Sequence, residues 1–283
     1  MIIRVYNVSK PRKFNSMGAD GKSAEIRVEP LLTIEPDTDN AGVGNSSFSQ
    51  SGYSLAEFFI WRKKRMKKKN LYWLVESAIM IALAAVLELV SKSIIPEMTF
   101  GGQITIVSML PVVLVAWKYG VGKGLVTGFI YSLVQMVMGI STISKMILPT
   151  SDEYLGSLLN ILLMFAFDYI LAYTVLGLSA MYKKAIKKDY ISLPLGAFTV
   201  LLLRYICHIV SGYVLFGAWA EWFFTQEGFY SWGETIMNTF SGNGLSLVYS
   251  IIYNGFYMIP EIIITTVVAV VISKIPQITK TRA

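Results

Sequence analysis

The sequence predicts an all-α integral membrane protein with six transmembrane helices and both termini in the cytoplasm. Of its 283 residues, 54% are hydrophobic and only 15% are charged, and the mean hydropathy is +0.55. A soluble domain normally carries about 25% charged residues. Apolar runs of spanning length recur from Trp73 onward, and basic residues gather in alternate connections between them. These observations exclude most soluble enzymes, disordered proteins and fibrous proteins.

The chain has two parts of different composition. Residues 1–65 are rich in Ser, Gly, Asn, Asp and Glu and contain no long apolar run, which predicts a disordered tail. The membrane domain is predicted to cover residues 66–283. Because Met66 is followed directly by three lysines, a further hypothesis is that the natural chain starts there and that the tail is not native.

Six apolar runs in the membrane domain are long enough to be transmembrane helices. A bilayer core of about 30 Å is crossed by about 20 helical residues. Gly120 and Gly122 mark the turn between the second and third runs, and Pro194 stands near the start of the fifth, where proline is tolerated. The predicted helices cover residues 72–95, 104–118, 121–140, 155–181, 192–216 and 248–273.

The basic residues predict the topology. The alternate connections hold only Lys92 and Lys145, and residues 217–247 hold none. Since Lys and Arg are enriched on the cytoplasmic side, both termini are expected there. The pI of 9.3 therefore reflects topology, and no nucleic-acid partner is expected. The other basic residues precede the first helix or lie in the second and fourth connections and the C-terminal tail: Arg62, Lys63, Lys64, Arg65, Lys67, Lys68, Lys69, Lys118, Lys123, Lys183, Lys184, Lys187, Lys188, Lys274, Lys280 and Arg282.

The connection at residues 217–247 is long, acidic and rich in aromatic residues. It contains Trp219, Trp222, Phe223 and Glu221 among others. Trp and Tyr favour the membrane interface, because an apolar ring with a polar edge suits that boundary. Two interpretations stay open: an interfacial helix, or a lid over an external binding site.

Four ionisable residues fall at membrane depth, where a charge is costly and usually faces a cavity or a partner. They are Glu88, Asp168, Arg204 and His208. Arg204, His208, Gly212 and Phe216 recur at spacings of four, so a helix places them on one face. This face is interpreted as the lining of a polar pocket. Alternatively, or in addition, Arg204 pairs with Asp168 and neutralises it.

The surroundings of Asp168 point to a cationic ligand. A carboxylate next to Tyr169 and near Tyr173 can neutralise an organic cation or hydrogen-bond an amidine-like heterocycle, while the rings offer cation–π contact. In the last helix, Tyr249 and Asn254 add a phenol and an amide. Asn254 is a candidate for contact with a ligand hydroxyl or ring nitrogen.

Small residues line one side of the first helix. Ala78, Ala82 and Ala85 form a face of the kind that permits close helix contact in lipid. The contact can be internal, or it can be a surface for a partner protein.

The sequence lacks the motifs of enzymes and metalloproteins. It has no phosphate-binding Gly-Lys-Ser/Thr loop and no His-Glu-x-x-His. A single histidine and a single cysteine leave too few ligands for a His- or Cys-based metal site. We therefore expect no enzymatic activity, no metal and no cofactor.

Three segments in this order resemble the thiamine-specific substrate-binding (S) subunit of energy-coupling factor vitamin transporters, over roughly residues 70–275. They are Asp168-Tyr169-Ile170-Leu171-Ala172-Tyr173, Arg204-x-x-x-His208-x-x-x-Gly212, and Tyr249-Ser250-x-x-Tyr253-Asn254-Gly255. The resemblance implies a six-helix fold with a thiamine pocket near the outer face. Asp168 takes the place of the family's glutamate, Phe216 that of a tryptophan, and Tyr169, His208, Tyr249 and Asn254 match in kind.

Two departures from the family pattern bear on the ligand. Asp168 has a shorter reach than glutamate and Phe216 stacks less strongly than tryptophan, so a thiamine precursor or related pyrimidine stays open. The segment at residues 217–247 is also longer than the family pattern leads us to expect.

The resemblance also implies partners and a location. The subunit would dock through Ala78, Ala82 and Ala85 on a transmembrane coupling subunit in the bacterial plasma membrane, surrounded by lipid, and two cytosolic ATPase subunits would supply the energy. Two alternatives stay open. They are an ion-coupled secondary transporter of a small organic cation and an S subunit for another vitamin such as riboflavin. A membrane-embedded enzyme is disfavoured, because it would need paired carboxylates near the cytoplasmic interface, whereas the polar cluster is expected on the outer side.

Overall fold

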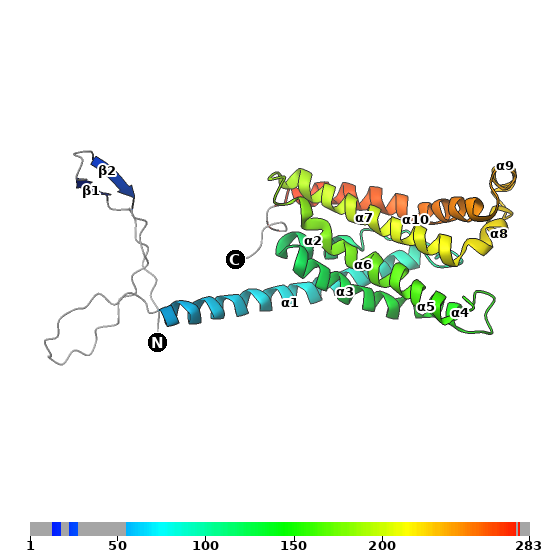
Figure 1. Cartoon of the computed structure of the whole chain (residues 1–283), viewed down its shortest axis with the longest axis horizontal. Coiled ribbons are helices and arrows are strands. Elements are labelled where there is room, and N and C mark those ends of the chain that lie inside the picture. Colours follow the sequence, from blue (N-terminus) through cyan, green and yellow to red (C-terminus); the bar gives the residue numbers. More distant parts are fainter. Residues whose placement is uncertain (1–12, 18–22, 28–54, 276, 278–283) are drawn as a thin grey trace. The chain divides into compact units, whose positions relative to one another are not determined.

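The computed structural model describes residues 13–17, 23–27, 55–275 and 277 (Figure 1). The chain divides into two units, Met1–Ser54 and Leu55–Ala283, and each is described by itself. In the first unit, β1 (Lys13–Met17) and β2 (Ser23–Arg27) form an antiparallel pair with Lys13 opposite Arg27. The predicted disordered tail lies mostly outside the described residues, and it stays a prediction, as does the hypothesis of a start at Met66.

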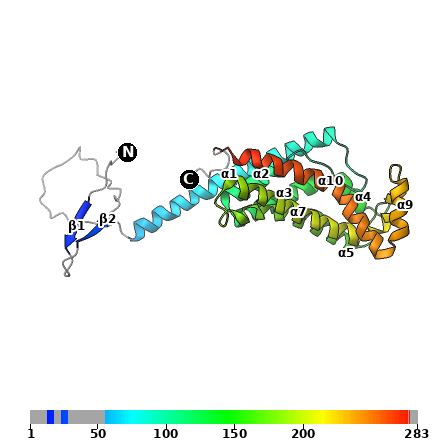
Figure 2. The same ribbon diagram turned by 90° about the horizontal axis from the view of Figure 1, so that it is seen from above.

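The second unit consists of helices and loops in its described residues. Figures 1 and 2 show its long helices running side by side, with α7 and α10 in extensive contact. Four consecutive elements, from α5 to the 3₁₀ helix η2, make one continuous helical run that includes the π-helical turn η1. The elements are α1 (Leu55–Ile94), α2 (Leu110–Tyr119), α3 (Val121–Met138), α4 (Ile140–Ile147), α5 (Leu158–Met164), η1 (Phe165–Leu171), α6 (Ala172–Thr174), η2 (Val175–Tyr182), α7 (Asp189–Leu215), η3 (Gly217–Trp219), α8 (Ala220–Phe224), α9 (Tyr230–Thr239) and α10 (Gly242–Ser273).

Five helical segments of the described chain are long and apolar enough to cross a membrane. They are Asn70–Ile94, Val121–Met138, Leu158–Tyr182, Asp189–Leu215 and Gly242–Ser273. Large apolar side chains remain exposed along them, as on a lipid-facing surface; examples are Leu83, Val126, Phe198 and Ile263. The prediction of an α-helical, multi-pass membrane protein is therefore confirmed, apart from the number of spans.

The predicted helix at 104–118 differs most from the structure. Only α2, with ten residues, is formed there, which corresponds to about 15 Å of helix. Val107 has a positive φ of 62°, and the helix begins only at Leu110, with Pro111 in its first turn, so residues 104–109 form a loop. The count of six membrane-spanning helices is not confirmed by helix length alone.

Helix α2 lies in the core although it is short. Leu110 to Trp117 are all buried, and α2 packs against α1, α3 and η2. Next to it, α3 and η2 approach very closely at Gly124, where an added Cβ would lie 2.6 Å from the Gly177 carbonyl oxygen. Small residues permit such backbone contact between membrane helices.

Helix boundaries account for the remaining differences. Helix α1 begins at Leu55 instead of residue 72, because the intervening Lys and Arg residues are good helix formers. Residues 121–140 are predicted as one helix, but in the structure this helix is interrupted at Gly139, after which α4 begins. The acidic and aromatic connection at 217–247 contains η3, α8 and α9, and α10 starts within it at Gly242.

Candidate functional site

One cavity contains all six residues that the sequence predicts as ligand-binding. Asp168, Tyr169, His208, Phe216, Tyr249 and Asn254 line it. About 920 Å³ in this region is not filled by protein atoms, including open solvent at the mouth. The structure thus brings together residues that lie as far apart as 168 and 254 in the chain. The other lining residues are Glu88, Lys92, Glu97, Phe100, Gly101, Gly102, Gln103, Thr105, Gln135, Gly139, Thr142, Met146, Met164, Tyr173, Arg204, Gly212, Tyr253 and Tyr257.

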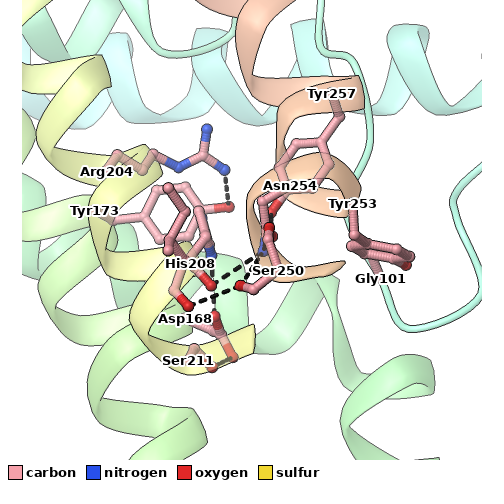
Figure 3. A network of polar contacts seen from close by, with 11 residues as sticks. Gly101, Asp168, Tyr173, Arg204, His208, Ser211, Ser250, Tyr253, Asn254 and Tyr257 are labelled. Atoms are coloured by element: carbon pink, nitrogen blue, oxygen red, sulfur yellow. Dashed lines mark hydrogen bonds and ion pairs between the residues drawn. The ribbon is translucent and has the colours of Figure 1, made fainter. Parts of the chain in front are cut away.

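Asp168 is held by two side chains of α7. His208 Nδ1 lies 3.0 Å from Asp168 Oδ1, and Ser211 Oγ donates to Oδ2 at 2.5 Å (Figure 3). Asp168 stands on the π-helical turn η1, and such turns occur frequently at functional sites. Its side chain keeps 21% of its surface exposed, so the carboxylate is oriented but not sealed off.

His208 presents a free ring nitrogen at the same place. Its Nε2 is buried and has no hydrogen-bond partner among the described residues. With Nδ1 donating to Asp168, the neutral ring has Nε2 as an acceptor. A buried polar atom without a partner is costly, so this ring nitrogen can accept a hydrogen bond from a molecule in the cavity.

Arg204 does not pair with Asp168, so that interpretation is wrong. Its Nη1 lies 3.1 Å from Glu261 Oε2, and Nη2 donates to the Tyr173 hydroxyl at 3.2 Å. Glu261, on α10, is fully buried and also accepts from Thr105 Oγ1 at 2.6 Å. Arg204 precedes His208 by one turn of α7. The structure pairs Asp168 with His208 and Ser211, whereas Arg204 is placed opposite Glu261.

Asn254 joins α7 to α10. Its Nδ2 donates to the His208 carbonyl oxygen at 3.1 Å and to the Ser250 carbonyl oxygen at 2.9 Å, while Oδ1 accepts from Tyr257 at 2.6 Å. Gly212 permits this contact, because a Cβ there would lie 2.3 Å from Ser250 Oγ. The amide therefore has protein partners of its own as well as a place in the cavity wall.

Aromatic rings cover one side of the cavity. Phe100, from the loop between α1 and α2, has its ring centroid 5.8 Å from that of Phe216 and 5.2 Å from that of Trp219. The Tyr253 hydroxyl ties this loop to α10, since it accepts from the Phe100 backbone N–H at 3.0 Å and donates to the Gly101 carbonyl oxygen at 2.9 Å. Residues of 217–247 thus reach the site.

The three alanines of α1 lie outside the cavity. Ala78 and Ala82 are exposed and Ala85 is partly exposed, whereas the buried side of the helix carries Ser77, Ile81, Ala84, Glu88 and Ser91. The small-residue face is therefore not an internal contact in this structure.

Sequence reasoning missed several members of the cavity wall. Gln135 and Tyr257 come from predicted helices without having been singled out, and Glu97 comes from the loop after α1. A signal existed for Gln135, because an uncharged amide within an apolar spanning run is as unusual as the ionisable residues that were noted.

Three comparisons with known proteins all lead to thiamine transporters. Residues 74–232 match the family described as "Thiamine transporter protein". The chain is 30% identical over 211 residues to the thiamine transporter ThiT of Bacillus subtilis (strain 168), across 71% of this chain and 90% of that protein. A solved structure of ThiT from Listeria monocytogenes superimposes with a TM-score of 0.52 at 19% identity, covering 75% of this chain and 99% of the other, which shows a shared fold.

Proposed function

Because the chain belongs to the thiamine transporter family, we propose that it binds thiamine at the outer membrane face and carries it inward as the substrate-binding subunit of an energy-coupling factor importer. The members of this family are transport proteins, and the chain is a multi-pass protein of the cell membrane. The observation that carries the proposal is the cavity in which Asp168, oriented by His208 and Ser211, stands among aromatic rings.

The cavity suits the two ends of thiamine. An aminopyrimidine offers amino N–H donors, which match the Asp168 carboxylate as acceptor. Tyr169, Phe216 and Tyr249 offer ring faces for stacking and for contact with a cationic ring. His208 Nε2 is a further acceptor. Asn254, with partners already in the protein, acts in this proposal mainly by positioning His208 and Tyr257.

The finer topology is part of the proposal. Five spans would leave the two termini on opposite sides of the membrane, whereas the basic residues favour the cytoplasm for both. We assign the sixth crossing to the segment from the end of α1 to Tyr119. Here α2 is the helical half, and the loop just before it is buried at Gln103, Thr105, Ser108 and Met109. Irregular backbone at membrane depth is tolerated where protein surrounds it.

The coupling partners are also proposed. Energy would come from two cytosolic ATPase subunits acting through a transmembrane coupling subunit, because the chain has no nucleotide-binding loop of its own. The exposed alanine face of α1 supports a close helix contact with the coupling subunit.

Ligand binding by the purified chain in detergent tests the proposal. Trp219 and Trp222 contact Phe100 in the cavity wall, so intrinsic tryptophan fluorescence should report occupancy. We expect quenching by nanomolar thiamine and a much weaker response to its pyrimidine precursor and to riboflavin. Asp168→Ala and His208→Ala should abolish the thiamine response.

The control is Asp189→Ala, which removes an exposed carboxylate at the start of α7, outside the cavity. A response to riboflavin in place of thiamine would keep the fold and discard the substrate. If none of the three ligands changes the fluorescence, the proposed function is contradicted and an ion-coupled carrier of another small cation is favoured.

A further inference from the structure

The cavity wall contains a buried carboxylate that is not among the residues matching the family. Glu88 lies on the inward side of α1, in line with Ile81 and Ala84 at helical spacing, and is 5% exposed. It lines the cavity together with Lys92 and Gln135. A carboxylate at membrane depth is costly unless it is paired or serves a ligand.

The neighbours of Glu88 hold one oxygen more firmly than the other. Oε2 accepts from the Tyr131 hydroxyl at 3.3 Å and from Gln135 Nε2. Oε1 lies 3.8 Å from Lys92 Nζ, one helical turn further along α1. This is beyond hydrogen-bond distance, and no other described residue donates to Oε1. The carboxylate is therefore oriented through one oxygen, while the other is only loosely compensated.

The other charges of the cavity are already engaged. The Asp168 carboxylate is bound by His208 and Ser211, and Arg204 is compensated by the fully buried Glu261. Glu97 accepts a hydrogen bond from Thr142. Carboxylates thus outnumber cations around the cavity, and Glu88 is the buried carboxylate among them, with Lys92 Nζ 3.8 Å away and within ion-pair distance only.

From this geometry we propose that Glu88 is the counter-charge for the cationic ring of the ligand and determines the preference for a permanently charged ligand over a neutral one. The inference rests on the proposed function, since it concerns the same cavity. Asp168 serves the hydrogen-bonding end of the ligand and Glu88 the charged ring. Lys92 opposes the effect, because it lies within ion-pair distance of the same carboxylate.

The test compares thiamine with its neutral isostere, in which a carbon atom replaces the charged ring nitrogen. Glu88→Gln keeps the size of the side chain and removes its charge. We expect it to weaken thiamine binding at least about tenfold, as for loss of a charge pair at low effective dielectric, and to change binding of the neutral isostere less than about twofold. Lys92→Gln should strengthen thiamine binding and leave the isostere unchanged. Affinities are measured by calorimetry on purified protein, with Glu153→Gln as a control outside the cavity.

The outcomes separate this inference from the proposed function. If the unaltered chain does not bind thiamine, the proposed function fails. If it binds thiamine and Glu88→Gln weakens both ligands equally, Glu88 has a structural role and the inference is overturned. Unchanged thiamine affinity in Glu88→Gln overturns it as well. Should Glu88→Gln not fold, Glu88→Asp decides, because it keeps the charge and draws it back by one methylene. Weaker binding of thiamine with unchanged binding of the neutral isostere supports the counter-charge, and equal changes for both ligands overturn it.

Discussion

At the scale of single residues, the site is organised by which carboxylate meets which basic group. Asp168 and Glu261 both lie within reach of α7, yet Asp168 pairs with His208, and Arg204 pairs with Glu261. The first pair leaves an exposed carboxylate edge and a free imidazole nitrogen, as a binding site needs. The second pair is almost fully buried and has further partners in Tyr173 and Thr105, as a structural pair needs.

This division predicts different consequences of mutation. Removing one partner of a buried ion pair leaves an uncompensated charge and typically costs about 3–5 kcal/mol. We expect Glu261→Gln to lower the free energy of unfolding by this amount, and the double variant Arg204→Met with Glu261→Met to be more stable than Glu261→Gln. Chemical denaturation in detergent, followed by circular dichroism, measures both.

The matched control is Lys145→Gln. Lys145 pairs with Glu153 at 3.5 Å, but its side chain is 55% exposed. We therefore expect Lys145→Gln to lower the free energy of unfolding by less than about 1 kcal/mol. Equal losses for Glu261→Gln and Lys145→Gln would refute the structural role of the buried pair.

At the scale of elements, the segment at 217–247 packs its aromatic rings against the cavity wall. Its helices α8 and α9 are short, and their aromatic rings form a continuous cluster with α10. Phe223 is central to it, with ring centroids 5.3 Å from Tyr249 and 5.6 Å from Tyr253, both in the cavity wall. An interfacial helix and a lid are therefore not exclusive here, because the same helix can lie at the interface and support the wall.

Phe223→Ala tests this supporting role. Each ring contact contributes about 0.5–1.5 kcal/mol, so loss of the two should lower thiamine affinity several-fold by loosening Tyr249 and Tyr253. Fluorescence titration measures the affinity. Phe198→Ala is the matched control, since Phe198 is exposed on the apolar surface of α7 and should leave binding unchanged. The same affinity in both variants would show that α8 does not position the wall.

At the scale of the whole molecule, the chain presents two separate surfaces for its proposed task. The cavity is built mainly from the loop between α1 and α2, from η1, α7 and α10, and from the inward side of α1, whereas the exposed alanines lie on another side of α1. One helix therefore contributes to the binding site with Glu88 and to the proposed docking surface with Ala78 and Ala82. This arrangement predicts that binding and transport can be separated by mutation.

Ala82→Trp should separate them. A large ring on the small-residue face blocks close helix contact, so thiamine uptake by cells that contain the coupling subunits should fall at least about tenfold. Thiamine affinity of the purified variant should stay the same, since Ala82 is exposed and outside the cavity. Ile206→Trp, at an exposed position on α7, is the control for added bulk. Uptake that survives Ala82→Trp would locate the docking surface elsewhere.

By itself, the sequence determined the membrane class, most of the helices and the residues that meet in one cavity. Hydropathy and residue spacing are local properties of the sequence. A spacing of four places Arg204, His208, Gly212 and Phe216 on one side of a helix, so no knowledge of distant segments is needed. Only the tertiary structure decided that Arg204 pairs with Glu261, that Asn254 bridges two helices and that α2 is short and enclosed. These features depend on the depth and rotation of helices far apart in the chain, and packing of the whole bundle sets both.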